Sequence, residues 1–358
     1  MTSTQPSSAA FAGSTGLVVG RFSGSAREWD AFAVRAEDST FCHAYGWQDV
    51  MTDVLGHQSV YLAARDSSGT VRGILPLVRV RSRLFGHYLV SLPFLNYGGP
   101  VGDREAQRAV TVAAREEAVR SGADLLELRA RHEVDSELTR RDRKVTVLLP
   151  LPASADELFA KQFTAKLRSQ IRKPQKEGLQ FRVGGAELVA SFYDVFAEHM
   201  RDLGTPVLPR ALFESLPRHL GAHVVFGVVL DGDRPVAVGC GFVWRDEFEI
   251  TWASALRSYA KQAPNMLLYW GLMEHAIGLG MKTFNFGRCT PDSGTHKFKL
   301  QWGGAHTVAL PWLQWSKDAR DATPSPDARG YKLAVQAWQK LPLSLTKLIG
   351  PFLARRIP

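Results

Sequence analysis

Three consecutive apolar segments, joined by tight turns, constrain the fold of this chain most strongly. They span residues 224–230, 236–244 and 247–254, and the turns DGDRP and RDE separate them. Short apolar runs broken by such turns predict an antiparallel meander of strands. A predicted helix over 265–279 and a predicted strand over 283–287 follow the meander, so this part of the chain indicates an α+β domain.

The first half of the chain shows the same order of elements. A hairpin is predicted across the turn DSSG, a strand at 88–92 leads into the glycine-rich loop FLNYGGPVGD, and a helix over 104–121 follows. We therefore predict two α+β domains of similar layout, at 16–150 and 151–316, although no residue-level repeat is visible. Outside them we expect a disordered N-terminus at 1–15, a charged linker at 317–330 and a basic amphipathic tail at 331–358.

The charge of the chain points to an anionic partner. Its 358 residues carry a net charge of +9, and the pI is about 9.6. Such a balance favours nucleic acid, a phosphorylated substrate or a membrane surface, and a generally basic composition is the competing interpretation. Aromatic residues do not alternate with the cations of the most basic segment, which argues against binding of single-stranded nucleic acid.

Cysteine usage and hydropathy indicate the compartment. Cys42, Cys240 and Cys289 form an odd, sparse set without C-x-x-C spacing, which predicts a reducing compartment and neither a disulfide framework nor a metal site. The N-terminus MTSTQPSSAAFAG does not resemble a signal peptide, and no apolar run reaches about 18 residues. We expect a cytoplasmic protein. Its tail either docks on the body or makes peripheral contact with the inner face of the membrane.

The segment KQFTAKLRSQIRKPQKEG concentrates positive charge on a predicted helix. Arg168 and Arg172 lie four residues apart, Lys173 follows, and Pro174 should end or kink the helix near its last turn. Like charges at this spacing repel one another, so they do not serve local helix stability. An anionic partner would relieve that repulsion, and Arg suits phosphate particularly well. We predict that this segment binds substrate; a solvated basic face is the alternative.

The stretch TPDSGTHKFKLQWGG places cations among aromatics and glycines directly after an apolar strand. Arg288, Lys297 and Lys299 can hold a carboxylate or phosphate there, or stabilise a developing oxyanion. Cys289 is expected to be a buried free thiol. Two further loops carry candidate binding residues, because polar groups follow a helix end at Asp202 and Thr205, and because free helix amides are expected at Asn265.

Together these stretches resemble the FemAB-like branch of the GNAT acyltransferase superfamily. The motifs that carry the resemblance are LRSQIRKPQKEGL, HMRDLGTPVLP, EITWAS, APNMLLYW, FNFGRCTPDSGTHKFKLQWG and AWQKLPLSLTKLIGP. The chain is most similar to FemAB proteins associated with exosortase/PEP-CTERM exopolysaccharide systems. The resemblance covers most of the chain from Leu17 onward and is strongest after residue 160.

The resemblance implies a fold and an activity. The fold is α+β, with two tandem GNAT-like domains whose mixed, largely antiparallel sheets are flanked by helices. The implied activity is transfer of an acyl or aminoacyl group to an amine in cell-envelope, peptidoglycan or exopolysaccharide assembly. The donor would be a co-substrate, aminoacyl-tRNA or acyl-CoA, rather than a tightly bound cofactor, and the acceptor an amine-bearing envelope or glycan precursor. The alternative is a non-catalytic module that binds an anionic glycan, lipid or nucleic acid.

The resemblance also assigns residues. Phe298 and Lys299 match positions at the family's reaction site, and Arg288 joins them as a catalytic candidate. The implied substrate-binding residues are Arg168, Arg172, Lys173, Asp202, Thr205, Trp252, Asn265, Tyr269, His296, Lys297 and Trp302.

Three departures from the family pattern affect these assignments. The stretch SYAKQAPNM lacks the glycines of the usual pyrophosphate loop, which argues against ordinary acetyl-CoA binding. The segment 178–187 is too short for the helical hairpin that some FemAB enzymes insert, which argues against tRNA binding. Asn285 replaces the usual aspartate of F-D-F-G, so no carboxylate base is expected at that point.

Overall fold

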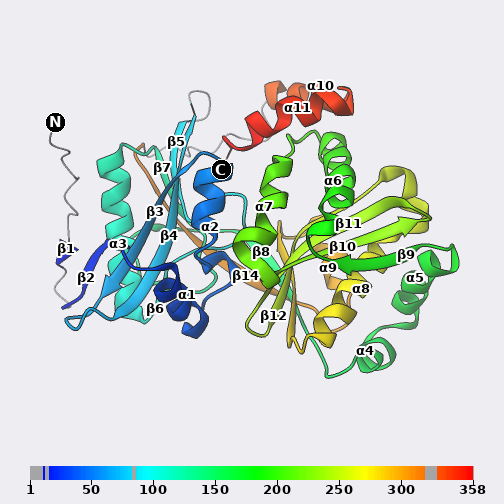
Figure 1. Cartoon of the computed structure of the whole chain (residues 1–358), viewed down its shortest axis with the longest axis horizontal. Helices are drawn as coiled ribbons and strands as arrows, with labels where there is room; N and C mark the ends of the chain where they lie inside the picture. The colour runs from blue at the N-terminus through cyan, green and yellow to red at the C-terminus, as the bar shows by residue number, and fades with distance from the viewer. Residues whose placement is uncertain (1–10, 13–15, 83–85, 319–328, 358) are drawn as a thin grey trace. The chain divides into compact units, whose positions relative to one another are not determined.

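The structure is a computed structural model of the chain, and it describes residues 11–12, 16–82, 86–318 and 329–357 (Figure 1). These residues divide into two compact units. The first comprises residues up to 142 together with 310–323, and the second comprises 143–309 together with 324–357. Most of the N-terminal stretch predicted to be disordered and most of the predicted linker lie outside the described residues, but Phe11 and Ala12 of that stretch form strand β1.

The first unit contains a mixed sheet in the order β1–β2–β3–β4–β5–β7–β14, with β6 paired to β4. Neighbouring strands are antiparallel, except that β5 and β7 are parallel. The strands are β1 (Phe11–Ala12), β2 (Val18–Arg21), β3 (Gln58–Arg65), β4 (Val71–Ser82), β5 (Gly86–Val90), β6 (Val101–Gly102), β7 (Leu125–Leu128) and β14 (His306–Ser316). The helical segments are α1 (Ala26–Arg35), η1 (Phe41–His43), α2 (Trp47–Asp49), η2 (Val50–Val54) and α3 (Arg104–Ser121).

Helix α3 covers the core of the first unit, and its ends are encoded locally. The Asp103 side chain accepts from the Ala106 amide at 3.0 Å, which satisfies a free donor of the first turn. Gly122 ends the helix in the left-handed conformation, with φ of 67°. The buried face consists mainly of alanine and Val110, and these short side chains let the helix lie close to the sheet.

The second unit contains a sheet in the order β8–β13–β12–β11–β10–β9. Only β12 and β13 are parallel. The strands are β8 (Thr139–Pro150), β9 (Gln180–Gly184), β10 (Val224–Asp231), β11 (Arg234–Trp244), β12 (Glu247–Ala255) and β13 (Thr283–Cys289). The helical segments are α4 (Ala155–Glu157), η3 (Leu158–Gln162), α5 (Ala165–Lys176), η4 (Ala186–Leu188), α6 (Val189–Leu203), α7 (Arg210–Leu220), η5 (Gly221–His223), η6 (Arg257–Gln262), α8 (Pro264–Gly278), α9 (Gly294–Leu300), α10 (Arg329–Gln339) and α11 (Leu343–Ala354).

Helices cover both faces of this second sheet. Strand residues alternate between the faces, so Phe226 of β10 meets Phe192 of α6 with ring centroids 5.3 Å apart. The next residue, Gly227, faces α8, where a Cβ would lie 2.9 Å from the Leu272 side chain. Helix α8 therefore packs against one face, while α6 and α7 pack against the other. The predicted meander, helix and strand are confirmed, and so is the α+β fold class.

Several elements differ from the sequence-based expectation. The pattern predicts no helix between residues 290 and 304, yet α9 forms there, because the Ser293 hydroxyl accepts from the His296 amide at 3.2 Å and caps the first turn. The basic tail, expected as one amphipathic stretch, forms two helices separated near Pro342. Strands β9 and β14 are additional to the predicted ones.

Candidate functional site

The candidate site lies where the one parallel strand pair of the described second unit ends. Strands β12 and β13 pair over three residues only, and the last pair is Glu249 with Asn285. Beyond this pair β12 continues toward Ala255, while β13 has a register irregularity against β8 between Asn285 and Arg288. Ligands commonly bind at the carboxyl ends of strands where a sheet changes its connection. This end of the strand pair is therefore the place to look for chemistry.

Lys299 of α9 reaches the irregular end of β13. Its side chain is buried, with the residue 4% exposed. The Nζ atom donates to the carbonyl oxygens of Gly287 at 2.7 Å and Arg288 at 3.1 Å. A lysine ammonium has three N–H donors, so one remains for a ligand oxygen. Burial lowers the pKa of Lys299 to about 8, and Cys289 and then Glu249 partly oppose that shift electrostatically.

Asn285 organises the polar groups at the end of the strand pair. Its Oδ1 accepts from the Thr146 hydroxyl at 2.7 Å and from the Gly287 amide at 2.8 Å. Its Nδ2 donates to Glu247 at 2.9 Å and to Glu249 at 3.3 Å. The fully buried amide is thus satisfied by partners on both neighbouring strands.

Glu249 corrects the expectation that this point has no carboxylate. The residue is 1% exposed, and its Oε1 accepts from the Thr251 hydroxyl at 3.1 Å. The acid comes from the neighbouring strand rather than from position 285, so the motif around Asn285 cannot reveal it. A local signal exists: Glu249 stands between the buried Phe248 and Ile250 in a strand pattern, and a buried acid needs polar partners.

Aromatic residues hold α9 in place from the other side. Phe298 lies 5.0 Å from Tyr269 and 6.3 Å from Trp302, between ring centroids. Trp302 is fully buried, and burial raises the pKa of Tyr269 above its usual value. The structure therefore brings together Phe298, Tyr269 and Trp302, three of the predicted site residues, in a packed cluster that supports the helix carrying Lys299.

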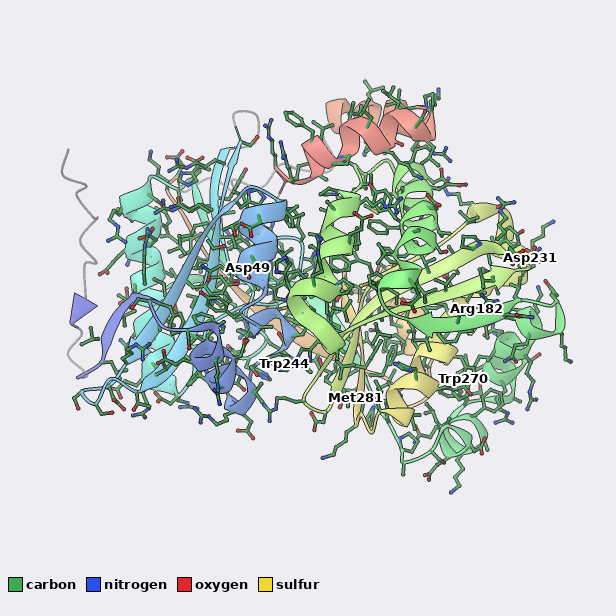
Figure 2. The ribbon with its side chains drawn as sticks, viewed as in Figure 1. Asp49, Arg182, Asp231, Trp244, Trp270 and Met281 are labelled. Carbon is green, nitrogen blue, oxygen red and sulfur yellow. The ribbon has the colours of Figure 1, made fainter. Side chains whose placement is uncertain are left out.

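A close backbone approach continues this support. A Cβ on Gly303 would overlap the carbonyl oxygen of Gln162, so only glycine fits at this position. Next to it, Phe163 packs on Trp302 with centroids 5.6 Å apart. Trp270 of α8, labelled in Figure 2, packs 5.7 Å from Phe163. The segment after α9 is thereby held against the segment before α5.

His296 and Lys297 occupy opposite environments on α9. His296 is buried, its Nδ1 accepts from the Asp292 amide at 3.1 Å, and its Nε2 lies 2.8 Å from the Thr307 hydroxyl. Both ring nitrogens thus have partners within the chain, and they join the turn before α9 to β14. Lys297 is exposed, so the two predicted binding residues do not converge on the end of Lys299.

The basic helix α5 is tied to its own surroundings. Arg168 donates to the carbonyl oxygens of Phe163 at 2.6 Å and Ala160 at 3.3 Å. Arg172 lies over the Phe159 ring at 5.0 Å. Lys173 donates to the carbonyl oxygen of residue 261 in η6, and Pro174 lies in the last turn, as predicted. Arg172 and Lys173 are nevertheless exposed and open to an anion.

The other predicted binding residues form a separate group. Asp202, at the end of α6, pairs with Arg201 at 2.7 Å and lies 3.9 Å from the Arg257 side chain, and the exposed Thr205 follows in the next loop. Trp252 of β12 meets Phe213 of α7 edge-on at 5.2 Å. The contacts of this group are with α6, α7, α10, β11 and η6 rather than with Lys299.

The start of α8 takes the place of a glycine loop. Ala263 has φ of 56°, a left-handed conformation that favours glycine. Pro264 then begins the helix, and Asn265 is partly exposed in its first turn. The turn therefore keeps a glycine-like backbone conformation without the glycine.

Within the part of the chain that the structure describes, no group of His, Cys, Asp and Glu side chains could hold a metal ion. Cys42, Cys240 and Cys289 are buried free thiols, and for Cys289 this agrees with the expectation. Among the described helices, none is long and apolar enough to cross a membrane.

Residues 161–300 match the family model of the acetyltransferase (GNAT) domain. No curated protein matches the chain. The crystal structure of FemX is similar with a TM-score of 0.63 and 15% identity, over 83% of this chain and 97% of that chain. The C-terminal domain of a proposed lysylphosphatidylglycerol synthetase from Agrobacterium fabrum has a TM-score of 0.57 and 15% identity, over 83% and 93%. L-PGS from Bacillus licheniformis has a TM-score of 0.52 and 14% identity, over 90% and 96%.

These likenesses concern the fold. They confirm the predicted α+β architecture, and the family model of the GNAT acetyltransferase domain matches residues 161–300 of the second unit. The association with exosortase/PEP-CTERM systems stays a prediction.

Proposed function

We propose that this chain transfers an acyl or aminoacyl group to an amine, with the chemistry in the second unit. One observation carries the proposal. Lys299 from α9 and Glu249 from β12 are both buried at the end of the strand pair, and the charge of Glu249 acts on the Lys299 ammonium. A buried lysine with a perturbed pKa beside a buried carboxylate is typical of functional sites. Both lie inside the segment that matches the GNAT acetyltransferase domain, which supports the same class of reaction.

The reaction needs few groups from the protein. The lone pair of a neutral amine attacks the acyl carbonyl carbon, and a C–N bond forms. The C–O bond of an ester donor, or the C–S bond of a thioester donor, then breaks. One proton leaves the amine nitrogen, and the leaving alkoxide or thiolate takes up a proton. Catalysis therefore depends on positioning the two substrates and on stabilising the tetrahedral oxyanion.

The two buried groups fit these two requirements. The third N–H donor of Lys299 can bind the acyl carbonyl oxygen, and its ammonium charge would stabilise the oxyanion. Its other two donors are held by the carbonyl oxygens of Gly287 and Arg288, so the ammonium is oriented before substrate arrives. Glu249 can accept the proton that the amine loses. Asn285 and the Thr251 hydroxyl hold that carboxylate by hydrogen bonds.

The donor class and the acceptor follow from chemistry and family resemblance. We propose an acyl-CoA or aminoacyl-tRNA donor and an amine-bearing envelope or glycan precursor as acceptor, in a cytoplasmic step of envelope or exopolysaccharide assembly. Arg172 and Lys173 are exposed cations that can receive donor phosphates. One structural neighbour is named as a lysylphosphatidylglycerol synthetase, so aminoacyl donors are the first to test.

The test is transfer by the purified chain. Acetyl-CoA and aminoacyl-tRNA would be offered with amine acceptors, and acylated product measured by mass spectrometry. Lys299→Met should lower turnover by about 100- to 1,000-fold, the effect of losing an oxyanion donor. Lys282→Met, at an exposed lysine before β13 with no assigned role, is the matched control and should retain activity.

Equal turnover by wild type and Lys299→Met would contradict the assignment. A donor that raises the melting temperature without any product from any acceptor would favour the non-catalytic binding module.

A further inference from the structure

The C-terminal helix α11 has two different faces, and only one of them is used within the chain. Thr346, Gly350 and Ala354 recur every four residues and are buried. Gly350 lies against Val207, where a Cβ would come within 3.1 Å of the backbone. Lys347 beside them pairs with Asp194 of α6 at 2.7 Å. Figure 1 shows α11 beside α6, so one face of the helix is docked on the second unit.

The opposite face is apolar and exposed. Leu345, Leu348 and Phe352 are 38%, 74% and 50% exposed. At about 100° per residue, these three positions fall within an arc of about 60°, opposite the arc of the docked positions. A helix that is apolar on both sides but packed on one side only has an exposed apolar face. Such a face is typical of a helix that binds a membrane or another protein.

The charge around this face selects the covering partner. From Tyr331 to the end, the chain has five Lys or Arg residues and no Asp or Glu. The guanidinium of Arg356 lies 3.8 Å from the Phe352 ring centroid, and that of Arg355 lies 5.1 Å away. A cation beside an exposed ring places positive charge at the border of the apolar surface. This is the arrangement of a helix that lies in the interface of an anionic bilayer.

We propose that the exposed face of α11, formed by Leu345, Leu348 and Phe352 with Arg355 and Arg356, binds an anionic membrane surface while the opposite face stays docked on α6. The inference is independent of the transfer chemistry. The proposal combines the two alternatives given for the tail. One face of α11 stays docked on α6 while the opposite face contacts the membrane.

The experiment is co-sedimentation of the full chain with vesicles of phosphatidylglycerol, and with vesicles of phosphatidylcholine. We expect binding to the anionic vesicles that weakens as salt is raised. Leu348→Asp with Phe352→Asp should reduce the bound fraction at least about tenfold, because apolar contacts are replaced by charges that the anionic surface repels. Both residues point away from the docked face, so the melting temperature should change little.

The matched control has the same change of charge at exposed apolar positions elsewhere. Val112 and Val119 of α3 are 52% and 59% exposed, and Val112→Asp with Val119→Asp should bind vesicles like the wild type. If the double α11 variant is unstable, Leu348→Asp alone tests the most exposed position.

Three results would overturn the proposal. The first is no binding to phosphatidylglycerol, and the second is equal binding to both lipids. The third is a dimer in light scattering that Leu348→Asp dissolves, because a second copy would then cover this face.

Discussion

Among the described strands, each unit has one parallel pair three residues long, and the two pairs end in different ways. In the first unit the pair ends at Val90 with Glu127, and the chain itself fills the space beyond. Arg129, 4% exposed, donates to the carbonyl oxygens of Leu92 at 3.3 Å and Leu95 at 2.8 Å and lies over a tryptophan ring. In the second unit, β12 continues as a strand, and side chains from three elements meet at the end of the pair.

The difference supports the proposal that the chemistry lies in the second unit. The loop after β5 enters its strand junction so closely that a Cβ on Gly99 would lie 2.6 Å from Ala130 Cα. In the second unit no loop follows Glu249, because β12 continues as a strand to Ala255 through a β-bulge at Thr251. Both units thus contain a short parallel strand pair. In the first unit the backbone fills the end of the pair, and in the second unit the side chains of Lys299 and Glu249 lie there.

The largest effect is expected at Glu249. If it accepts the amine proton, Glu249→Gln should lower kcat/KM by at least about 100-fold, because the amide keeps the shape but cannot take a proton. Glu247→Gln makes the same change two residues earlier, at a partner of Asn285, and should lower kcat/KM far less. Steady-state kinetics with a saturating donor would measure both. Similar losses in the two variants would remove the base from Glu249.

The corresponding change in the first unit should affect stability instead. Arg129→Met would leave carbonyl oxygens and the Glu127 carboxylate buried without their cation, and we expect a loss of about 3–5 kcal/mol in the free energy of unfolding. Arg108→Met removes an exposed ion pair and should change the free energy by less than about 1 kcal/mol. Denaturant titration gives both values. A stable Arg129→Met protein without turnover would place chemistry in the first unit.

The charge of Lys299 should make stability depend on pH. Its pKa is about 8 in the folded chain and 10.5 in the reference state, so between these values the unfolded chain binds more protons. Stability should therefore rise with pH from about 8 to about 10.5, by up to about 3 kcal/mol relative to Lys299→Met. Urea titrations of both proteins across this range measure the difference. A difference that falls with pH would show that the ammonium is stabilised rather than opposed by its site.

The smallest effect concerns the start of α8. Ala263 adopts a left-handed backbone conformation, so Ala263→Gly should relieve strain of about 1–2 kcal/mol but increase the entropy of the unfolded chain. We expect a net gain of less than about 1 kcal/mol, seen as a slightly higher melting temperature. Gly278→Ala provides a contrasting control within the same helix, because it has φ outside the left-handed region and space for a Cβ.

The sequence predicts elements well where periodicity and turns are local. The meander, α3 and α8 follow from apolar alternation, caps and tight turns, and Lys299 follows from a motif. The seven-residue helix α9 escapes prediction because it is too short for a periodic signal and depends on one serine cap.

The remaining features of the site depend on pairings distant in sequence. Glu249 meets Asn285 because β12 and β13 pair in parallel, and α8 lies between these two strands in the sequence. No local pattern in the sequence predicts the register of this pairing. The same reason applies to Arg168. Its guanidinium donates to the carbonyl oxygens of Ala160 and Phe163, and the helical pattern of the sequence does not reveal these hydrogen bonds.

Gly303 determines which substitutions near α9 would displace Lys299. The contact of the Gly303 backbone with Gln162 involves no side chain of its own, so variation of neighbouring side chains leaves the spacing unaltered. A methyl group at 303 would shift α9 as a body and move the ammonium away from the end of β13, although no reacting group had been replaced. Gly303→Ala would thus alter the distance between the Lys299 ammonium and the end of β13, while every reacting group stays the same.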